Sequence, residues 1–301
     1  MSYEQGLGKV IIVGAGPGDP ELITVKAASY LQKADVILTD RLVSEEILKK
    51  YAAVTTKIIY VGKQCRKGIT TPQSTINALM VSYALKGNLV VRLKGGDVSV
   101  FSNLLDELET LVANNIPYEI IPGITAGIGA AAYAGIPLTA RGYSTAVRFL
   151  TYYKTEIVTD QYWKELANTD DTLIFYMSSE TLSQVVKKLI ENNITPDKLI
   201  AVIEQATTPM QKVYTSNLYE YEDNITQRYV SPTLVIIGKV VALSQQFAWI
   251  DNSLQNEHYF QPLTNSDRSG KEVLKDLIEN DEQVSALSSE TKAIKRYVTR
   301  A

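Results

Sequence analysis

The sequence predicts an α/β protein made of two α/β domains, and three observations support this fold class. Short β-rich runs alternate with segments of helical spacing over most of the chain, a pattern typical of a largely parallel sheet. A small-residue segment at 122–137 separates one alternating set from a second. The chain has 301 residues, of which 45% are hydrophobic and 21% charged, so it is long enough for two ordinary globular domains.

Five strands are expected in the first set, each a short run of apolar and β-branched residues. They lie at 9–13, 36–39, 57–61, 89–93 and 118–121. Two of the segments between them carry clear helix signals. Ser44 is a good N-cap for a helix at 44–51. A helix at 75–85 would gather four apolar side chains on one face, namely Ile76, Leu79, Met80 and Tyr83.

The segment 122–137 has little side-chain volume between two proline-containing turns, which predicts a closely packed helix. We therefore place the domain boundary near Pro122, with an N-terminal domain at 8–122 and a C-terminal domain at 123–245. The second set is expected to hold a helix at 182–191 and strands near 147–151, 172–176, 199–203, 213–215 and 233–238. From about residue 251 the strand pattern ends, and 251–301 is predicted to be a helical or partly disordered tail.

Composition and charge limit the ligands, the chemistry and the location that we expect for the protein. The net charge is −3, with a basic excess in the N-terminal half, which is therefore the better candidate for an anionic ligand. No basic run interleaves with aromatic residues, so no nucleic-acid partner is expected. A single cysteine, Cys65, and a single histidine, His258, favour metal-free chemistry without disulfides. Without a secretory leader pattern or an apolar run of membrane length, we expect a soluble, cytoplasmic protein that does not bind membranes.

The first strand ends in a glycine-rich turn, Gly14-Ala15-Gly16-Pro17-Gly18-Asp19. Such a turn lets the backbone approach a ligand, and a nucleotide-like cofactor is the first hypothesis. The turn lacks the third glycine of the dinucleotide fingerprint and the Gly-Lys-Ser/Thr ending of a P-loop. Taken alone, a glycine-rich turn after a strand is more often structural than ligand-binding.

Four further strands end in polar or glycine-rich turns. In open α/β sheets, ligands bind outside the carboxyl ends of the strands, so we expect all five turns to collect on one edge. The four additional turns contain Asp40-Arg41, Gly95-Gly96-Asp97, 122–126 and 175–177.

Several sequence motifs in and around these turns, taken in chain order, resemble those of the tetrapyrrole methylase family. They are GAGPGDPELIT, ADVILTDRLVS, VGK, VRLKGGD, PGITAGIGAAAYAGIPLT and VIEQATTPMQKV, which together span residues 8–240. The resemblance implies that S-adenosylmethionine is bound in a trough between two α/β domains, and that the chain forms a homodimer. It also implies two methyl transfers to uroporphyrinogen III, giving precorrin-2 for sirohaem or cobalamin biosynthesis and releasing S-adenosylhomocysteine.

The resemblance also assigns roles to individual residues. Asp40 would be the proton acceptor and Lys63 the proton donor, although Asp40 could instead form a surface ion pair with Arg41. Met177 could be a core residue rather than an apolar wall for the cofactor. The implied cofactor contacts are Pro17, Gly95, Gly96, Asp97, Val100, Thr125, Ala126, Met177 and Ala206.

The implied small-molecule substrate, a tetrapyrrole, carries eight carboxylates, so its pocket should present guanidinium and ammonium groups. The main candidates are Arg41, Arg141 and Arg148, followed by Lys63, Arg66, Lys67 and Lys154.

The chain departs from the family pattern on the side expected to hold the acceptor. Ile69 and Ala140 stand where histidines are usual, Tyr152-Tyr153 replaces Gly-His, and 101–107 lacks the usual Phe-Gly-Arg-Gly run. Two alternatives therefore stay open: a methylase of another precorrin or related substrate, and a cofactor-binding protein with little catalytic activity.

Overall fold

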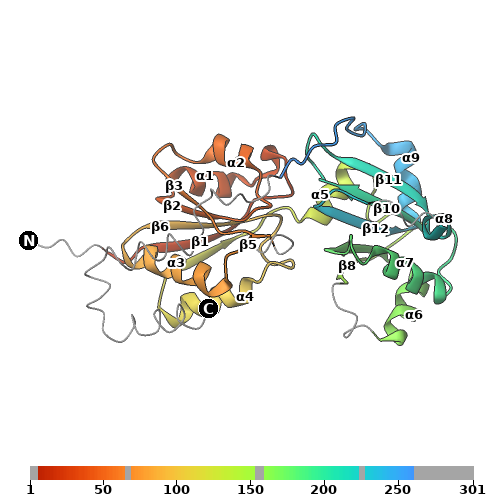
Figure 1. Ribbon diagram of the computed structural model, residues 1–301, viewed down its shortest axis with the longest axis horizontal. Coiled ribbons are helices and arrows are strands. Elements are labelled where there is room, and N and C mark those ends of the chain that lie inside the picture. The colour runs from red at the N-terminus through yellow and green to blue at the C-terminus, as the bar shows by residue number, and fades with distance from the viewer. Residues whose placement is uncertain (1–5, 65–68, 153–158, 224–227, 261–301) are drawn as a thin grey trace, which may run out of the picture. The chain divides into compact units, whose positions relative to one another are not determined.

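The computed structural model describes residues 6–64, 69–152, 159–223 and 228–260, and these form two compact units (Figure 1). The first unit comprises 6–124 together with Phe260, and the second comprises Thr125–Tyr259. The division falls between Ile124 and Thr125, a few residues after Pro122. The helices predicted beyond residue 260 lie outside the described residues.

The first unit is built on a five-stranded parallel sheet. The strands follow one another in the order β3-β2-β6-β1-β7, so the chain crosses over repeatedly within the sheet. In chain order they are β1 (Lys9–Gly14), β2 (Val36–Thr39), β3 (Lys57–Tyr60), β6 (Leu89–Lys94) and β7 (Tyr118–Ile121). All five predicted strands are confirmed. A separate two-stranded ribbon pairs β4 (Lys63–Gln64) with β5 (Ile69–Thr70) in antiparallel fashion.

Helices cover both faces of this sheet, as Figure 1 shows for α1 and α2 on one side and α3 and α4 on the other. The alternation of side chains along β1 explains the two layers. Val10 and Ile12 belong to the core cluster that includes α3, whereas Ile11 and Val13 belong to the cluster that includes α1 and α2. The covering elements are η1 (Pro20–Leu22), α1 (Val25–Lys33), α2 (Glu45–Tyr51), α3 (Gln73–Leu85) and α4 (Leu104–Ala113).

Helix α3 differs from its prediction. The sequence predicts one apolar face, but every residue from Thr75 to Ala84 except Asn77 is buried. The small and uncharged side chains on its other face allow neighbouring elements to close over it. The helix is therefore part of the core on nearly all sides rather than a surface helix.

The second unit contains a mixed sheet in the order β11-β10-β12-β9-β8. Only β8 and β9 are parallel, and the other three pairings are antiparallel. The predicted strands are confirmed as β8 (Val147–Thr151), β9 (Thr172–Tyr176), β10 (Leu199–Glu204), β11 (Lys212–Asn217) and β12 (Thr233–Gly238). The helices are α5 (Ala126–Tyr133), α6 (Asp160–Asn168), α7 (Leu182–Glu191), α8 (Leu218–Asp223), η4 (Lys239–Leu243) and α9 (Ser244–Phe247).

The expectation that five turns share one sheet edge is wrong. Four of them follow strands of the first sheet, but the turn after Tyr176 follows β9 of the second sheet. The strands belong to two separate sheets, so the five turns do not share one sheet edge. The error arose because β–α alternation in sequence was extended across the domain boundary.

Residues 251–259 pack on the second unit. The Asn252 amide accepts a hydrogen bond from the Val213 N–H (2.7 Å) and donates one to the Val213 carbonyl (3.0 Å). Since β11 is an edge strand, this side chain satisfies backbone groups that would otherwise be unpaired. Gln205 similarly binds the Glu257 carbonyl and the Tyr259 N–H.

No helix in the described part of the chain combines the length and apolar character needed to span a membrane.

Candidate active site

The turns at the carboxyl ends of β1, β6 and β7 pack backbone against backbone. A Cβ added at Gly14 would lie 2.6 Å from the Gly123 nitrogen and 2.7 Å from the Gly96 oxygen, and one added at Gly123 would lie 2.8 Å from the Gly14 carbonyl carbon, so glycine is required at both positions by close approach. Gly16 and Gly96 exchange two backbone hydrogen bonds, of 3.1 and 2.8 Å, and both have positive φ. The backbone N–H and carbonyl of Gly96 therefore hold the first turn in place.

Asp97 fastens these turns together. Its Oδ2 accepts a hydrogen bond from the Gly123 N–H (2.9 Å), and its Oδ1 accepts one from the Ser99 N–H (2.8 Å). Burial would raise the pKa of this carboxyl, but the hydrogen bonds from Ser99 and Gly123 outweigh that effect and lower it. Asp97 thus stays ionised and joins the turn after β6 to the turn after β7.

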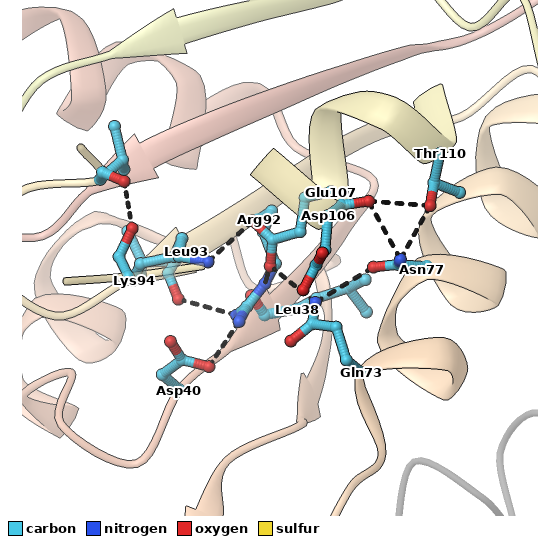
Figure 2. A network of polar contacts seen from close by, with 12 residues as sticks. Leu38, Asp40, Gln73, Asn77, Arg92, Leu93, Lys94, Asp106, Glu107 and Thr110 are labelled. Carbon is cyan, nitrogen blue, oxygen red and sulfur yellow. Dashed lines mark hydrogen bonds and ion pairs between the residues drawn. The ribbon is translucent and has the colours of Figure 1, made fainter. Parts of the chain in front are cut away.

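Beside the first sheet lies a group of four charged residues, Asp40, Arg92, Lys94 and Glu107, which we call the charged quartet (Figure 2); all but Asp40 are buried. Arg92 Nη2 donates to Asp40 Oδ1 at 2.6 Å, and Arg92 Nε donates to Glu107 Oε1 at 2.9 Å. Lys94 Nζ donates to Glu107 Oε2 at 2.7 Å. The Glu107 side chain has no exposed area, whereas that of Asp40 is 28% exposed. Asp40 is therefore the one member of the quartet that a solute can readily reach.

The charges of the quartet balance, with two cations facing two carboxylates. Isolated charges in a protein interior are costly, so each member depends on its partners. Burial, followed by the charge of Arg92, lowers the pKa of Lys94. Burial also acts to lower the pKa of Arg92, but Asp40 and Glu107 outweigh it, and the pKa is raised overall. Arg92 accordingly remains a permanent cation beside Asp40.

Neutral side chains extend the quartet to helix α3. Gln73 Nε2 donates to Glu107 Oε1 (3.5 Å) and to Asn77 Oδ1 (3.1 Å). Asn77 Nδ2 in turn donates to the Thr110 hydroxyl (2.8 Å) on α4. Figure 2 shows this chain of contacts leading from Asp40 to Thr110. The network ties α3 and α4 to the strand ends that carry Asp40 and Lys94.

Within the second unit, three turns carry residues that the sequence predicts to bind the cofactor. Thr125 is buried and is the N-cap of α5, where its hydroxyl lies 2.8 Å from the Tyr176 hydroxyl. Met177 follows β9 with φ of 55° and a 56% exposed side chain, so the alternative that it is a core residue is wrong. Ala206 lies between Gln205 and Thr207, which both have positive φ. Such backbone conformations are sparsely populated and concentrate at functional sites.

The predicted cationic residues have different surroundings. Arg41 is half-buried just after β2, next to Asp40 in sequence, and Arg141 is exposed in the turn between Ala140 and Ser144. Arg148 donates to Asp171 (2.5 Å) and Glu165 (2.5 Å), which raise its pKa. Arg148 is thus part of an ion-pair group of the second unit.

Other predicted residues are placed as follows. Pro17 is buried in the first turn, and Gly95, Val100 and Ala126 are half-buried. Lys63 lies in strand β4, where the structure describes its backbone but not its side chain. Arg66, Lys67 and Lys154 lie outside the described residues.

Sequence reasoning missed Arg92, Lys94 and Glu107 as members of the site. A signal was available, since Arg92 and Lys94 interrupt an apolar strand and stand two residues apart, on the same face of the sheet. A basic pair on a buried face requires acidic partners, and Asp40 and Glu107 meet this requirement.

Comparisons with known proteins point to one family. The family model described as Tetrapyrrole (Corrin/Porphyrin) Methylases matches residues 9–222. A uroporphyrinogen-III C-methyltransferase of Bacillus subtilis is 46% identical over 85% of this chain and 100% of its own length. A siroheme synthase of Acinetobacter baylyi is 45% identical over 81% of this chain and 53% of its own length. The chain therefore spans about half the length of the siroheme synthases it matches.

Solved structures show the same fold. Uroporphyrin-III C-methyltransferase from Thermus thermophilus matches with a TM-score of 0.67 and 32% identity, covering 81% of this chain and 98% of that one. A structure of that enzyme complexed with S-adenosyl homocysteine matches with a TM-score of 0.65 and 32% identity, covering 78% of this chain and 93% of that one. The motif order, the two sheets and these similarities lead to one conclusion: the chain belongs to the tetrapyrrole methylase family.

Proposed function

We propose that this protein is an S-adenosylmethionine-dependent C-methyltransferase that converts uroporphyrinogen III to precorrin-2 by two methyl transfers. The observation that carries the proposal is the Asp40 carboxylate, 28% exposed at the end of β2 and held by the buried guanidinium of Arg92. The identity to the Bacillus subtilis uroporphyrinogen-III C-methyltransferase, 46% over the whole of that protein, supports the same activity.

The residues of the second unit suit the proposed cofactor. Met177 offers an exposed thioether on a left-handed turn, beside which a polarizable or apolar group can pack. Thr125 and Ala126 at the start of α5, and Ala206 in the turn after β10, supply small side chains. S-Adenosylmethionine carries its methyl group on a positively charged sulfur, so the donor needs no activation by the protein. The remaining proposed contacts are Pro17, Gly95, Gly96, Asp97 and Val100.

The chain's own residues would then manage the proton and the acceptor. The methyl group is transferred as a cation to a carbon of a pyrrole ring, so the pyrrole must lose a proton to stay neutral, and Asp40 is suited to accept it. Arg92 keeps the carboxylate in one position and compensates its charge. Lys63 is the proposed proton donor, while Arg41 and Arg141 are proposed to pair with substrate carboxylates. Arg148 is a weaker candidate because two carboxylates already engage it.

Further aspects of the proposal rest on the family resemblance. We propose that the protein acts as a homodimer in the cytoplasm and that its product serves sirohaem or cobalamin biosynthesis. Light scattering on the purified chain tests the oligomeric state directly.

The decisive test incubates the purified chain with enzymatically generated uroporphyrinogen III and labelled S-adenosylmethionine. A dimethylated product is expected. If other precorrins are methylated and uroporphyrinogen III is not, the protein is a different methylase of the family. Retained binding of S-adenosylhomocysteine without any methylated product would instead indicate a cofactor-binding protein.

The role of Asp40 is tested by Asp40→Asn. Turnover should fall by about 10²- to 10⁴-fold, the usual contribution of a general base, with the affinity for S-adenosylhomocysteine nearly unchanged. Asp106→Asn is the matched control, since Asp106 is an exposed carboxylate in the first turn of α4. Wild-type turnover in Asp40→Asn would contradict the assignment.

A further inference from the structure

Tyr176, the last residue of β9, makes two buried hydrogen bonds to the start of helix α5. Its hydroxyl lies 2.8 Å from the Thr125 hydroxyl, and it accepts a hydrogen bond of 2.8 Å from the Gly127 N–H. The partners are 51 and 49 residues away along the chain. One phenol oxygen therefore joins the end of a strand to the first turn of a helix from a distant part of the sequence.

This contact gives the start of α5 the hydrogen-bond acceptor that an N-cap side chain usually provides. The first N–H groups of a helix lack partners within the helix, and an N-cap side chain normally satisfies one of them. Thr125 occupies the N-cap position of α5 but makes no capping hydrogen bond with its side chain. The Tyr176 hydroxyl instead satisfies the Gly127 N–H and also engages the Thr125 hydroxyl.

Gly127 makes the contact possible. A Cβ added at this position would lie 2.5 Å from the Tyr176 hydroxyl oxygen and 3.1 Å from the Ile174 Cγ2. Any larger residue would therefore push the phenol away from the start of α5. The close approach and the two hydrogen bonds together define a single tight junction between β9 and α5.

The junction lies between two sets of proposed cofactor contacts. Thr125 and Ala126 begin α5, and Met177 directly follows Tyr176 with a left-handed backbone. We infer that Tyr176 is a positioning residue that holds the Thr125-Ala126 turn and Met177 at the separation that the cofactor requires. This inference rests on the proposed function, because it assumes that both turns bind S-adenosylmethionine.

The first experiment measures the affinity for S-adenosylhomocysteine by calorimetry. Tyr176→Phe should weaken binding about 3- to 10-fold, the range expected when neutral hydrogen bonds that order a site are lost. KM for S-adenosylmethionine should rise to a similar extent, while kcat at saturation should change much less. Tyr219→Phe is the matched control, because the Tyr219 hydroxyl donates a hydrogen bond of 2.7 Å to the Ile194 carbonyl, away from these turns. The control should bind like the wild type.

A second variant keeps the inference testable even if Tyr176→Phe is poorly folded. Gly127→Ala should also weaken binding, because its new methyl group displaces the phenol. In the double variant Gly127→Ala/Tyr176→Phe the hydroxyl is gone, so the added methyl should cost less than it does beside Tyr176. If the affinity loss of the double variant equals the product of the losses of the two single variants, the two residues act independently, and the idea of a shared junction is overturned.

The outcomes separate the inference from the proposed function. If the wild-type protein does not bind S-adenosylhomocysteine, the proposed function fails. If the wild type binds and folded Tyr176→Phe binds equally well, the function stands and the positioning role of Tyr176 is refuted.

Discussion

The strand ends of the two units are stabilised by different chemistry. In the first unit, the charged quartet of Asp40, Arg92, Lys94 and Glu107 is charge-balanced, and all of its members except Asp40 are buried. In the second unit, Tyr176 and its partners use neutral hydroxyl and amide groups. The charged network holds the Asp40 carboxylate in place and compensates its charge. The neutral junction places no strong field beside the turns proposed to bind a cationic cofactor. The difference fits the proposed roles, in which Asp40 accepts a proton and the turns beside Tyr176 bind the cofactor.

The contrast between the charged quartet and the neutral junction predicts that the largest loss of stability comes from replacing Glu107. Glu107→Gln removes the carboxylate shared by Arg92 and Lys94 and leaves excess positive charge in the interior. The free energy of unfolding should fall by about 3–5 kcal/mol, as when one partner of a buried ion pair is lost. Urea unfolding monitored by circular dichroism measures the change.

Glu109→Gln provides the control for that measurement. Glu109 is an exposed residue of the same helix, and its replacement should change stability by no more than about 0.5 kcal/mol. Equal effects of the two substitutions would mean that the charged quartet does not stabilise the fold.

A smaller effect is expected in the neutral junction. Thr125→Val keeps the shape of the side chain and removes only the hydroxyl that contacts Tyr176. The Gly127 N–H keeps its acceptor, so the free energy of unfolding should fall by only about 0.5–1.5 kcal/mol. Thermal unfolding compares the stability of the wild type with that of Thr125→Val. Thr151→Val is the control, because Thr151 is exposed. A loss as large as that of Glu107→Gln would remove the contrast between the two regions.

The smallest effect concerns a charged group that is not buried. Glu119 on β7 accepts hydrogen bonds from Lys26, Tyr30 and Lys9, which lower its pKa from 4.5 to about 2. The folded state therefore binds this proton less readily than the unfolded state, and the stabilisation is complete above pH 4.5. It should be lost as the pH falls from 4.5 to about 2.

The test compares the stability of the wild type and Glu119→Gln across this acid range. The small advantage of the wild type at neutral pH should disappear toward pH 2. An advantage that persists unchanged in acid would show that Glu119 acts through packing rather than charge. Together with Glu107, this result separates the contribution of burial from that of charge.

Much of the secondary structure could be predicted from local patterns. The strands β2, β7, β8, β9 and β12 and the helix α7 have the predicted bounds residue for residue. Their apolar runs and amphipathic spacing are encoded by near neighbours in the chain. Helix α3 was harder, because the burial of its second face depends on what packs there.

The site was predicted less completely. Asp40, Thr125 and Met177 could be named because they follow strands within recognisable motifs. The partner of Asp40 was missed, because Arg92 is 52 residues away along the chain and lies within an apolar strand. Glu107 reaches the quartet only because α4 packs on the face of the sheet that bears Arg92 and Lys94.

The sequence by itself determined the family, the order of the strands and helices, and the residue types available at each strand end. Periodicity and turn chemistry are local properties, so they can be read from one chain. Only the tertiary structure decided that the second sheet is mixed, that Gly96 pairs with Gly16, and that Tyr176 caps α5. These features depend on contacts between residues distant in sequence, whose energies are decided by burial and geometry rather than by neighbours along the chain.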